Sequence, residues 1–231
     1  MFVRNTILIV FLTTAAVSLA GCKDKEKAEE PIAIFEEEIE SPSDSSVIDE
    51  IWYFFNGDIQ KNLQLARTTF SSKDYESMIH GIEKAEAIMK LESMRAAGQN
   101  KIDIDRSIEQ MGKLANDIRN EIFVPIPEYE QTFGNAQFVL GTFHLDKARE
   151  MWKKRDYFMT GRELHEASLN FENAYLWVDH KIDSTSTKAL DQSLKVASEL
   201  IDDAGWVPDD VVSSFNSMNN VANKLKDKVT T

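Results

Sequence analysis

The stretch Ala-Arg-Thr-Thr-Phe-Ser-Ser-Lys-Asp-Tyr at residues 66–75 returns as Ala-Arg-Glu-Met-Trp-Lys-Lys-Arg-Asp-Tyr at residues 148–157. Both copies hold an Ala-Arg pair, an aromatic residue four positions after the alanine, a basic residue and Asp-Tyr. The likeness continues at the same offset of 82 through Ala85 and Ala167. Self-similarity at a fixed offset is typical of stacked structural repeats. The sequence therefore predicts a duplicated unit.

A second echo, between residues 101–103 and 181–183, has an offset of 80, which indicates a two-residue slip in a loop. Each unit is expected to hold three helices, with Asp74 as the N-cap of the second and Asp103 or Asp105 at the start of the third. Apolar residues recur every three or four positions, which is the period of an amphipathic helix. The clearest such stripe is Ile104, Ile108, Met111, Ala115, Ile118 and Ile122.

These patterns predict an all-α fold of about seven helices in a single domain over residues 47–231. The repeat units are expected over 47–123 and 127–204, and a C-terminal capping helix over 208–229 begins at a proline, which suits a first helical turn. Gly134 and Gly141 lie seven residues apart on one side of a predicted helix. We expect a neighbouring helix to approach closely there.

The segments Leu65-Ala66-x-x-Thr69-Phe70-x-x-Lys73-Asp74-Tyr75-Glu76 and Lys147-Ala148-x-x-Met151-Trp152-x-x-Arg155-Asp156-Tyr157 resemble tetratricopeptide-type helical hairpins. Lys73 and Arg155 stand where that family usually has glycine, and the period here is 82 rather than about 34 residues. The resemblance implies a scaffold that binds proteins or peptides.

Residues 1–21 have the layout of a secretory signal peptide, with Arg4 before an apolar run that is too short to span a bilayer. The next feature, Leu19-Ala20-Gly21-Cys22, resembles the lipobox of bacterial lipoproteins. The resemblance implies cleavage between Gly21 and Cys22 and attachment of acyl chains to Cys22. Cys22 is the only cysteine of the chain, so it has no partner for an internal disulfide.

Residues 22–46 are expected to form a disordered tether because they hold nine acidic and three basic residues and few large apolar ones. Lys23 follows the cysteine where an aspartate retains enterobacterial lipoproteins at the inner membrane. The resemblance therefore favours the periplasmic face of the outer membrane, while inner-membrane retention and surface display stay open.

The chain has a formal net charge of −13. Such an excess of acid repels nucleic-acid backbones and anionic headgroups, so we expect no nucleic acid partner and a membrane link through the acylated Cys22 alone. An acidic scaffold favours a basic protein or peptide of the envelope as its partner, and such association should weaken in salt.

An aromatic run, Trp52, Tyr53, Phe54 and Phe55, covers every side of one helical turn. A single buried face cannot cover all four side chains. The run is therefore either packed among several helices or part of a surface that binds a partner.

Glu76, His80 and Glu83 share one helix face, and a His-x-x-Glu pair on a helix can bind zinc or iron. The second copy has Arg162 at the matching position, which favours the alternative of a solvated histidine beside acids. No other catalytic or cofactor motif is recognisable, so we expect no enzymatic activity and no cofactor.

Two functions compete on these grounds. The leading one is a non-catalytic, envelope-anchored adaptor that binds a protein or peptide. The alternative is a sensor or storage protein for a small molecule or metal. A large dry cavity lined by aromatic side chains would favour the alternative, and a shallow exposed groove would favour the adaptor.

Overall fold

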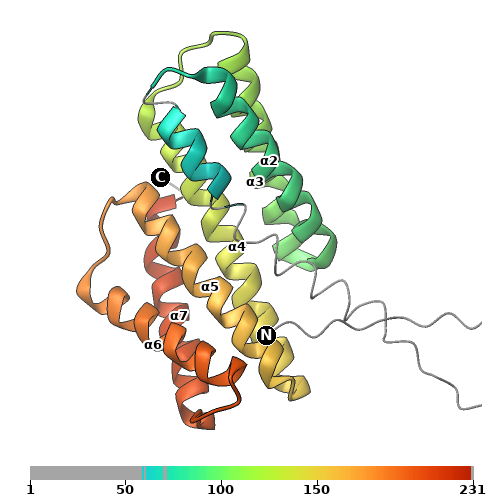
Figure 1. Ribbon diagram of the computed structural model, residues 1–231, viewed down its shortest axis with the longest axis vertical. Coiled ribbons are helices and arrows are strands. Elements are labelled where there is room, and N and C mark those ends of the chain that lie inside the picture. Colours follow the sequence, from blue (N-terminus) through green and yellow to red (C-terminus); the bar gives the residue numbers. More distant parts are fainter. Residues whose placement is uncertain (1–58, 60, 70–71, 230–231) are drawn as a thin grey trace, which may run out of the picture. The chain divides into compact units, whose positions relative to one another are not determined.

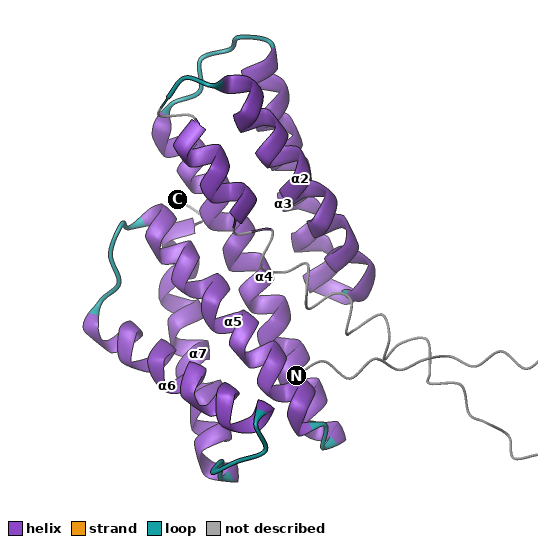
Figure 2. Cartoon of the chain, viewed as in Figure 1, coloured by secondary structure: helices purple, strands orange, loops and turns teal. Residues whose placement is uncertain are grey.

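The computed structural model describes residues 59, 61–69 and 72–229, all within one compact unit of the chain. In these ranges the chain is α-helical apart from short turns and loops, without a strand (Figure 2). The prediction of an all-α fold is confirmed. A helical segment at 61–69 precedes α2 (Tyr75–Arg95), α3 (Gly98–Arg119), α4 (Ile126–Lys154), α5 (Tyr157–Val178), α6 (Ser184–Ile201) and α7 (Pro208–Val229).

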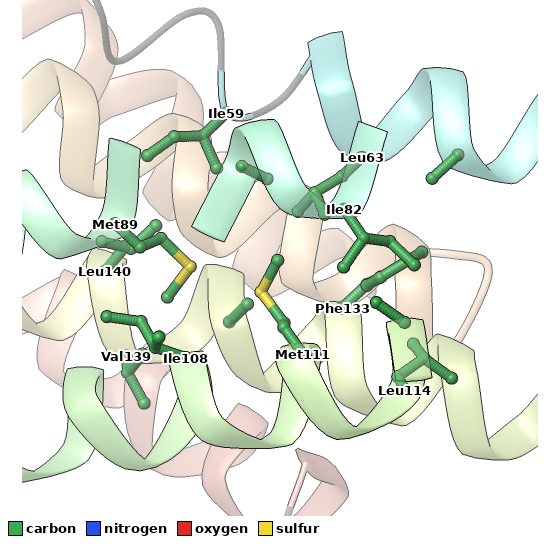
Figure 3. Packing of buried hydrophobic residues seen from close by; sticks show 14 of the residues in the cluster. Ile59, Leu63, Ile82, Met89, Ile108, Met111, Leu114, Phe133, Val139 and Leu140 are labelled. Atoms are coloured by element: carbon green, nitrogen blue, oxygen red, sulfur yellow. The ribbon is translucent and has the colours of Figure 1, made fainter. Parts of the chain in front are cut away.

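The longest described helix, α4, lies at the centre of the arrangement and packs against α3, α5 and α7 (Figure 1). Its first half contributes to one cluster of buried apolar side chains, shared with the segment 61–69, α2 and α3. Figure 3 shows part of this first cluster, with Leu63, Ile82 and Phe133 turned toward a common interior. The last turns of α4 join a second cluster with α5, α6 and α7. Burial on both sides makes α4 the common support of the two halves.

Burial in α3 and α6 repeats at an offset of 82, not at the 80 that the sequence echo indicated. Asp183 is the N-cap of α6, where its carboxylate accepts hydrogen bonds from the backbone N–H groups of Thr185 and Ser186. Asp103 instead lies inside α3. The matched buried pairs are Ile104 and Ser186, Ile108 and Leu190, Met111 and Ser193, Leu114 and Val196, and Ala115 and Ala197.

The expected start of the third helix at Asp103 or Asp105 is wrong, because α3 begins at Gly98. Gly98 has φ +58°, a conformation that glycine adopts without steric cost, and it reverses the chain directly after α2. The end of the stripe also differs from the prediction. Glu121 has φ 58° just beyond α3, and Ile122 follows it as a loop residue that is 54% exposed.

Gly134 and Gly141 both face α5, as predicted. A Cβ atom on Gly141 would lie 2.7 Å from the ring of Phe171, closer than real Cβ contacts allow. A Cβ atom on Gly134 would overlap Val178. The two glycines therefore set the close approach of α4 and α5.

Candidate functional site

An open groove of about 830 Å³ runs between α3, the first half of α4 and the end of α7. Its α3 wall is a helix face that flanks the buried stripe and shares Leu114 with it, because residues spaced by three and four positions align along a helix. That wall consists of Gln99, Asp103, Arg106, Gln110, Lys113, Leu114 and Asp117. The facing wall consists of Glu128, Gln131, Thr132, Asn135, Phe138 and Val139 of α4 with Lys226 and Val229 of α7.

Side-chain amides connect the walls of this groove. The Nδ2 group of Asn135 donates a hydrogen bond to Oε1 of Gln110 at 3.0 Å, which links α4 to α3. The Nε2 group of Gln131 donates to the carbonyl oxygen of Lys228 at 3.0 Å, which links α4 to α7. The amides thus fix the spacing of the walls and also present polar groups to the groove.

The groove is charge-balanced, in contrast to the acidic chain as a whole. Its lining holds three basic residues (Arg106, Lys113, Lys226) and three acidic ones (Asp103, Asp117, Glu128). Leu114, Val139 and Val229 are buried beneath them, and Phe138 packs partly buried against both apolar clusters. The described lining contains no histidine or cysteine. The groove therefore presents amides and charges above apolar side chains.

A second polar feature lies at the junction of α2, α4 and α5, where four ionisable residues form a buried network. Arg95 donates from Nη1 to Glu92 Oε2 at 2.8 Å and from Nη2 to Glu163 Oε1 at 2.7 Å. The other oxygen of Glu163 lies 2.6 Å from Nδ1 of His144. Glu163 therefore joins α2 to α4 as well as anchoring both to α5.

Burial and neighbouring charges shift the pKa values of this network. Burial raises the pKa of Glu92 above its ordinary value, more than the charges of His144 and Arg95 lower it. Burial alone would lower the pKa of His144, but the hydrogen bond to Glu163 and the charges of Glu163, Glu92 and Glu166 together raise it. The pKa of Glu163 is lowered, because His144 and Arg95 outweigh its burial.

The network is covered by protein, since Glu92, His144 and Glu163 are 0%, 1% and 5% exposed. Glu92 Oε1 is buried and has no hydrogen-bond partner among the described residues. A substrate cannot reach these groups in this arrangement. The network is therefore a structural tie between helices, and the groove is the better candidate for binding.

The predicted metal ligands lie elsewhere, on the face of α2 that borders a hollow of about 700 Å³ against the end of α3. Glu76 and His80 are exposed, and Glu83 pairs with Arg119 of α3. In the part of the chain that the structure describes, no three His, Cys, Asp or Glu side chains are grouped to hold a metal ion. Gly21, Cys22 and the aromatic run Trp52, Tyr53, Phe54 and Phe55 lie outside the described residues.

Sequence reasoning missed both the groove and the network. A signal existed for Glu92, which lies three residues after Met89 on the same helix face as the apolar residues of α2, and so places an acid on a buried face. His144 likewise lies on a stripe of α4, four residues after Leu140. The groove residues gave no such signal, because a polar helix face is usually solvated.

The chain matches no family model, no curated protein and no solved structure. Among the described helices, none combines the length and the apolar composition that crossing a membrane requires.

Proposed function

We propose that this chain is a non-catalytic, envelope-anchored lipoprotein that acts as a scaffold or adaptor and binds a protein or peptide in the groove between α3, α4 and α7. Acyl chains on Cys22 would hold it at the membrane, with the periplasmic face of the outer membrane favoured. The observation that carries the proposal is the groove itself, which is open, about 830 Å³ in volume, charge-balanced and floored by apolar side chains.

The alternative, a sensor or storage protein for a small molecule or metal, has less support. Small-molecule sites bury most of the ligand in a concave and largely apolar cavity. The groove instead has a lining rich in charges and amides, and the hollow beside Glu76, His80 and Glu83 has acids and Arg119 along its rim. These features favour a macromolecular partner.

The test is site-specific photo-crosslinking of the full chain in the organism that encodes it. A photo-reactive amino acid at Lys113 or Gln131 faces the groove, and the same amino acid at Lys188 on α6 is the matched control. Tyr53 adds a probe in the aromatic run. We expect one reproducible crosslinked partner from the two groove positions, absent from Lys188 and reduced by Cys22→Ser because that variant loses its anchor.

Two results would count against the proposal. Equal crosslinking from Lys188 and from the groove positions would mean that contacts are nonspecific. A partner trapped from Tyr53 alone would move the binding surface to the aromatic run. A stoichiometric metal in the purified wild type, lost in Glu76→Gln with His80→Ala, would support the alternative function.

A further inference from the structure

We propose that the buried network is a proton-operated latch between the two halves of the fold. When it is closed, it holds the corner between α2 and α3 (residues 90–103) against α4 and α5. Loss of the proton from His144 releases this corner and lets the helix ends there fray, while the rest of the fold stays intact. The inference concerns a conformational device and does not depend on what the groove binds.

The corner is held to the rest of the protein mainly by polar contacts. No described residue of α2 after Met89, and none of α3 before Ile104, belongs to either apolar cluster, and between the two helices only Ala96 does. Met94 is 77% exposed, and a Cβ atom on Gly98 would meet nothing within 4 Å. Apolar burial therefore fixes α2 as far as Met89 and does little to fix the corner.

Side-chain hydrogen bonds connect the corner to the second hairpin. Nη2 of Arg95 donates to Glu163 of α5 at 2.7 Å, and Nδ2 of Asn100 donates to Oδ2 of Asp146 on α4 at 2.9 Å. Water competes for the exposed bond of Asn100, so the buried ion pair of Arg95 is the stronger connection. Segments with few apolar contacts are the ones that open locally, and a role as a switch is among the best-attested uses of buried charges.

The charges that face His144 come from two neighbouring helices. Glu92 faces it from α2, and Glu163 and Glu166 face it from α5. When His144 is protonated, it shares the neutralisation of these three acids with Arg95. A neutral imidazole can still donate a hydrogen bond to Glu163, but it brings no charge. Arg95 is then the one cation of the network, and the buried acids gain by reaching water.

Nearby ionisable groups engage other partners and lie outside this contact. They belong to α3 and α5, the helices that pack against α4 on either side of the network. Lys101 and Asp105 of α3 bond to Ser93, Arg162 of α5 stacks on Phe158, and His165 of α5 lies 3.6 Å from Glu166.

The direction of the latch follows from the groups that titrate. The pKa values of His144 and Glu92 are both raised in the closed state. A raised pKa stabilises the closed state below the ordinary value and loses this effect as the pH rises. The pKa of Glu163 is lowered, so its contribution is lost only in acid below 4.5. The latch is therefore closed in mild acid and opens as the pH rises above 6.5.

Hydrogen–deuterium exchange can detect this opening, because a helix end without tertiary packing exposes its backbone N–H groups to water. The full chain in detergent micelles is measured by mass spectrometry from about pH 6 to about pH 9. Rates are converted to protection factors, which removes the intrinsic pH dependence of exchange. Peptides from the corner are compared with peptides from the first half of α2, which the apolar cluster holds.

Two variants accompany the wild type. His144→Gln keeps a hydrogen-bond donor beside Glu163 but cannot take up a proton. His180→Gln is the matched control, because His180 also lies beside a carboxylate, that of Glu130 at 3.5 Å, but is 57% exposed.

We expect the protection of the corner to fall by up to roughly tenfold for each pH unit above 6.5, as one proton is released on opening. The first half of α2 should stay protected. His144→Gln should lower the protection of the corner at about pH 6 toward its alkaline level and flatten the pH dependence. His180→Gln should behave as the wild type, and circular dichroism verifies that the fold persists.

Three results would overturn the inference. Equal loss of protection in the corner and in the first half of α2 would mean that the whole domain opens. Constant protection of the corner across the pH range would mean that the network is no latch. The same pH dependence in the wild type and in His144→Gln would assign it to another group. If His144→Gln does not fold, the comparison of the two parts of α2 in the wild type still decides.

Discussion

The two helical hairpins of this chain, one ending in α2 and the other formed by α4 and α5, share the backbone conformation of the two residues before α2 and before α5. Lys73 and Arg155 are left-handed, with φ 60° and 63°. Asp74 and Asp156 follow with φ and ψ of −87° and 77°, and −86° and 85°, and each caps the next helix through its carboxylate. The repeated sequence thus encodes a repeated local conformation.

The hairpins differ where they meet each other. Gly81 of α2 lies against the backbone of the segment 61–69, and its counterpart at the offset of 82 is Glu163, the centre of the buried network. Glu92 of the network corresponds to Ala174 in the second hairpin, and both are fully buried. The turn that both copies share forms each hairpin. The positions at which the two copies differ form the junction between the hairpins.

The strongest way to break that junction is to remove its centre. Glu163→Ala leaves Arg95 and His144 buried without their shared partner, which should lower the free energy of unfolding by about 3–5 kcal/mol. The measurement is urea unfolding followed by circular dichroism at about pH 6. Glu83→Ala is the control, since it removes an ion pair whose side chains are half exposed, and should cost at most about 1 kcal/mol. Equal decreases in the free energy of unfolding for Glu163→Ala and Glu83→Ala would mean that the buried network does not hold the helices together.

Each hairpin also has its own close helix approach, and these sites are the next most sensitive. A Cβ atom on Gly81 would lie 2.8 Å from the carbonyl oxygen of Asn62, and one on Gly141 would lie 2.7 Å from Phe171. Gly81→Ala and Gly141→Ala should each destabilise the protein by about 1–3 kcal/mol. Gly112 has room for a methyl group, so Gly112→Ala should instead stabilise by up to about 1 kcal/mol. Thermal unfolding of the three variants checks this order, and a stabilised Gly81→Ala would show that the first hairpin is loosely packed.

The pH dependence of unfolding tests the same junction by changing the protonation of its residues, and its expected effect is smaller than that of the substitutions. His144 has a pKa raised above 6.5, so its stabilising effect is complete below 6.5 and is lost as the pH rises through its folded-state value. Glu92, with a pKa raised above 4.5, also favours the folded state less as the pH rises. Glu163, with a pKa lowered below 4.5, stabilises above 4.5 and loses this effect as the pH falls through its folded-state value.

Stability should therefore be highest in mild acid and decline as the pH rises above 6.5. His144→Gln should flatten the alkaline decline, and urea unfolding at a series of pH values measures it. His80→Gln, which removes an exposed imidazole from α2, is the control. Parallel alkaline curves for the wild type and His144→Gln would show that His144 does not drive the dependence.

Local patterns made the fold predictable. The apolar stripe of α3, the N-cap at Asp74 and the close approach at Gly141 each depend on residues within a few turns of one another or on the absence of one side chain. The same reliance on local patterns explains why the start of α3 was predicted wrongly. Asp103 and Asp105 are good local caps, but the left-handed Gly98 turns the chain earlier.

The candidate site depended on which helices meet, and that is not a local property. The stripe of α2 could have shown that Glu92 is buried, but not that His144 and Glu163 would reach it from two other helices. The polar face of α3 becomes a groove only because the end of α7 lies alongside α4. Periodicity identifies the buried face of a helix, and it leaves the use of the remaining faces undecided.

The smallest expected effect in the comparison of the two hairpins concerns their shared turn. A left-handed conformation costs a residue other than glycine about 1–2 kcal/mol, while glycine adds entropy to the unfolded chain. Lys73→Gly and Arg155→Gly should therefore each raise the free energy of unfolding by up to about 1 kcal/mol, and the two gains should add because the turns belong to separate hairpins. Chemical unfolding of both single variants and the double variant measures this. Unequal gains would mean that side-chain contacts of Lys73 or Arg155 offset the strain in one turn, and the two hairpins would then share a backbone conformation without sharing its energetics.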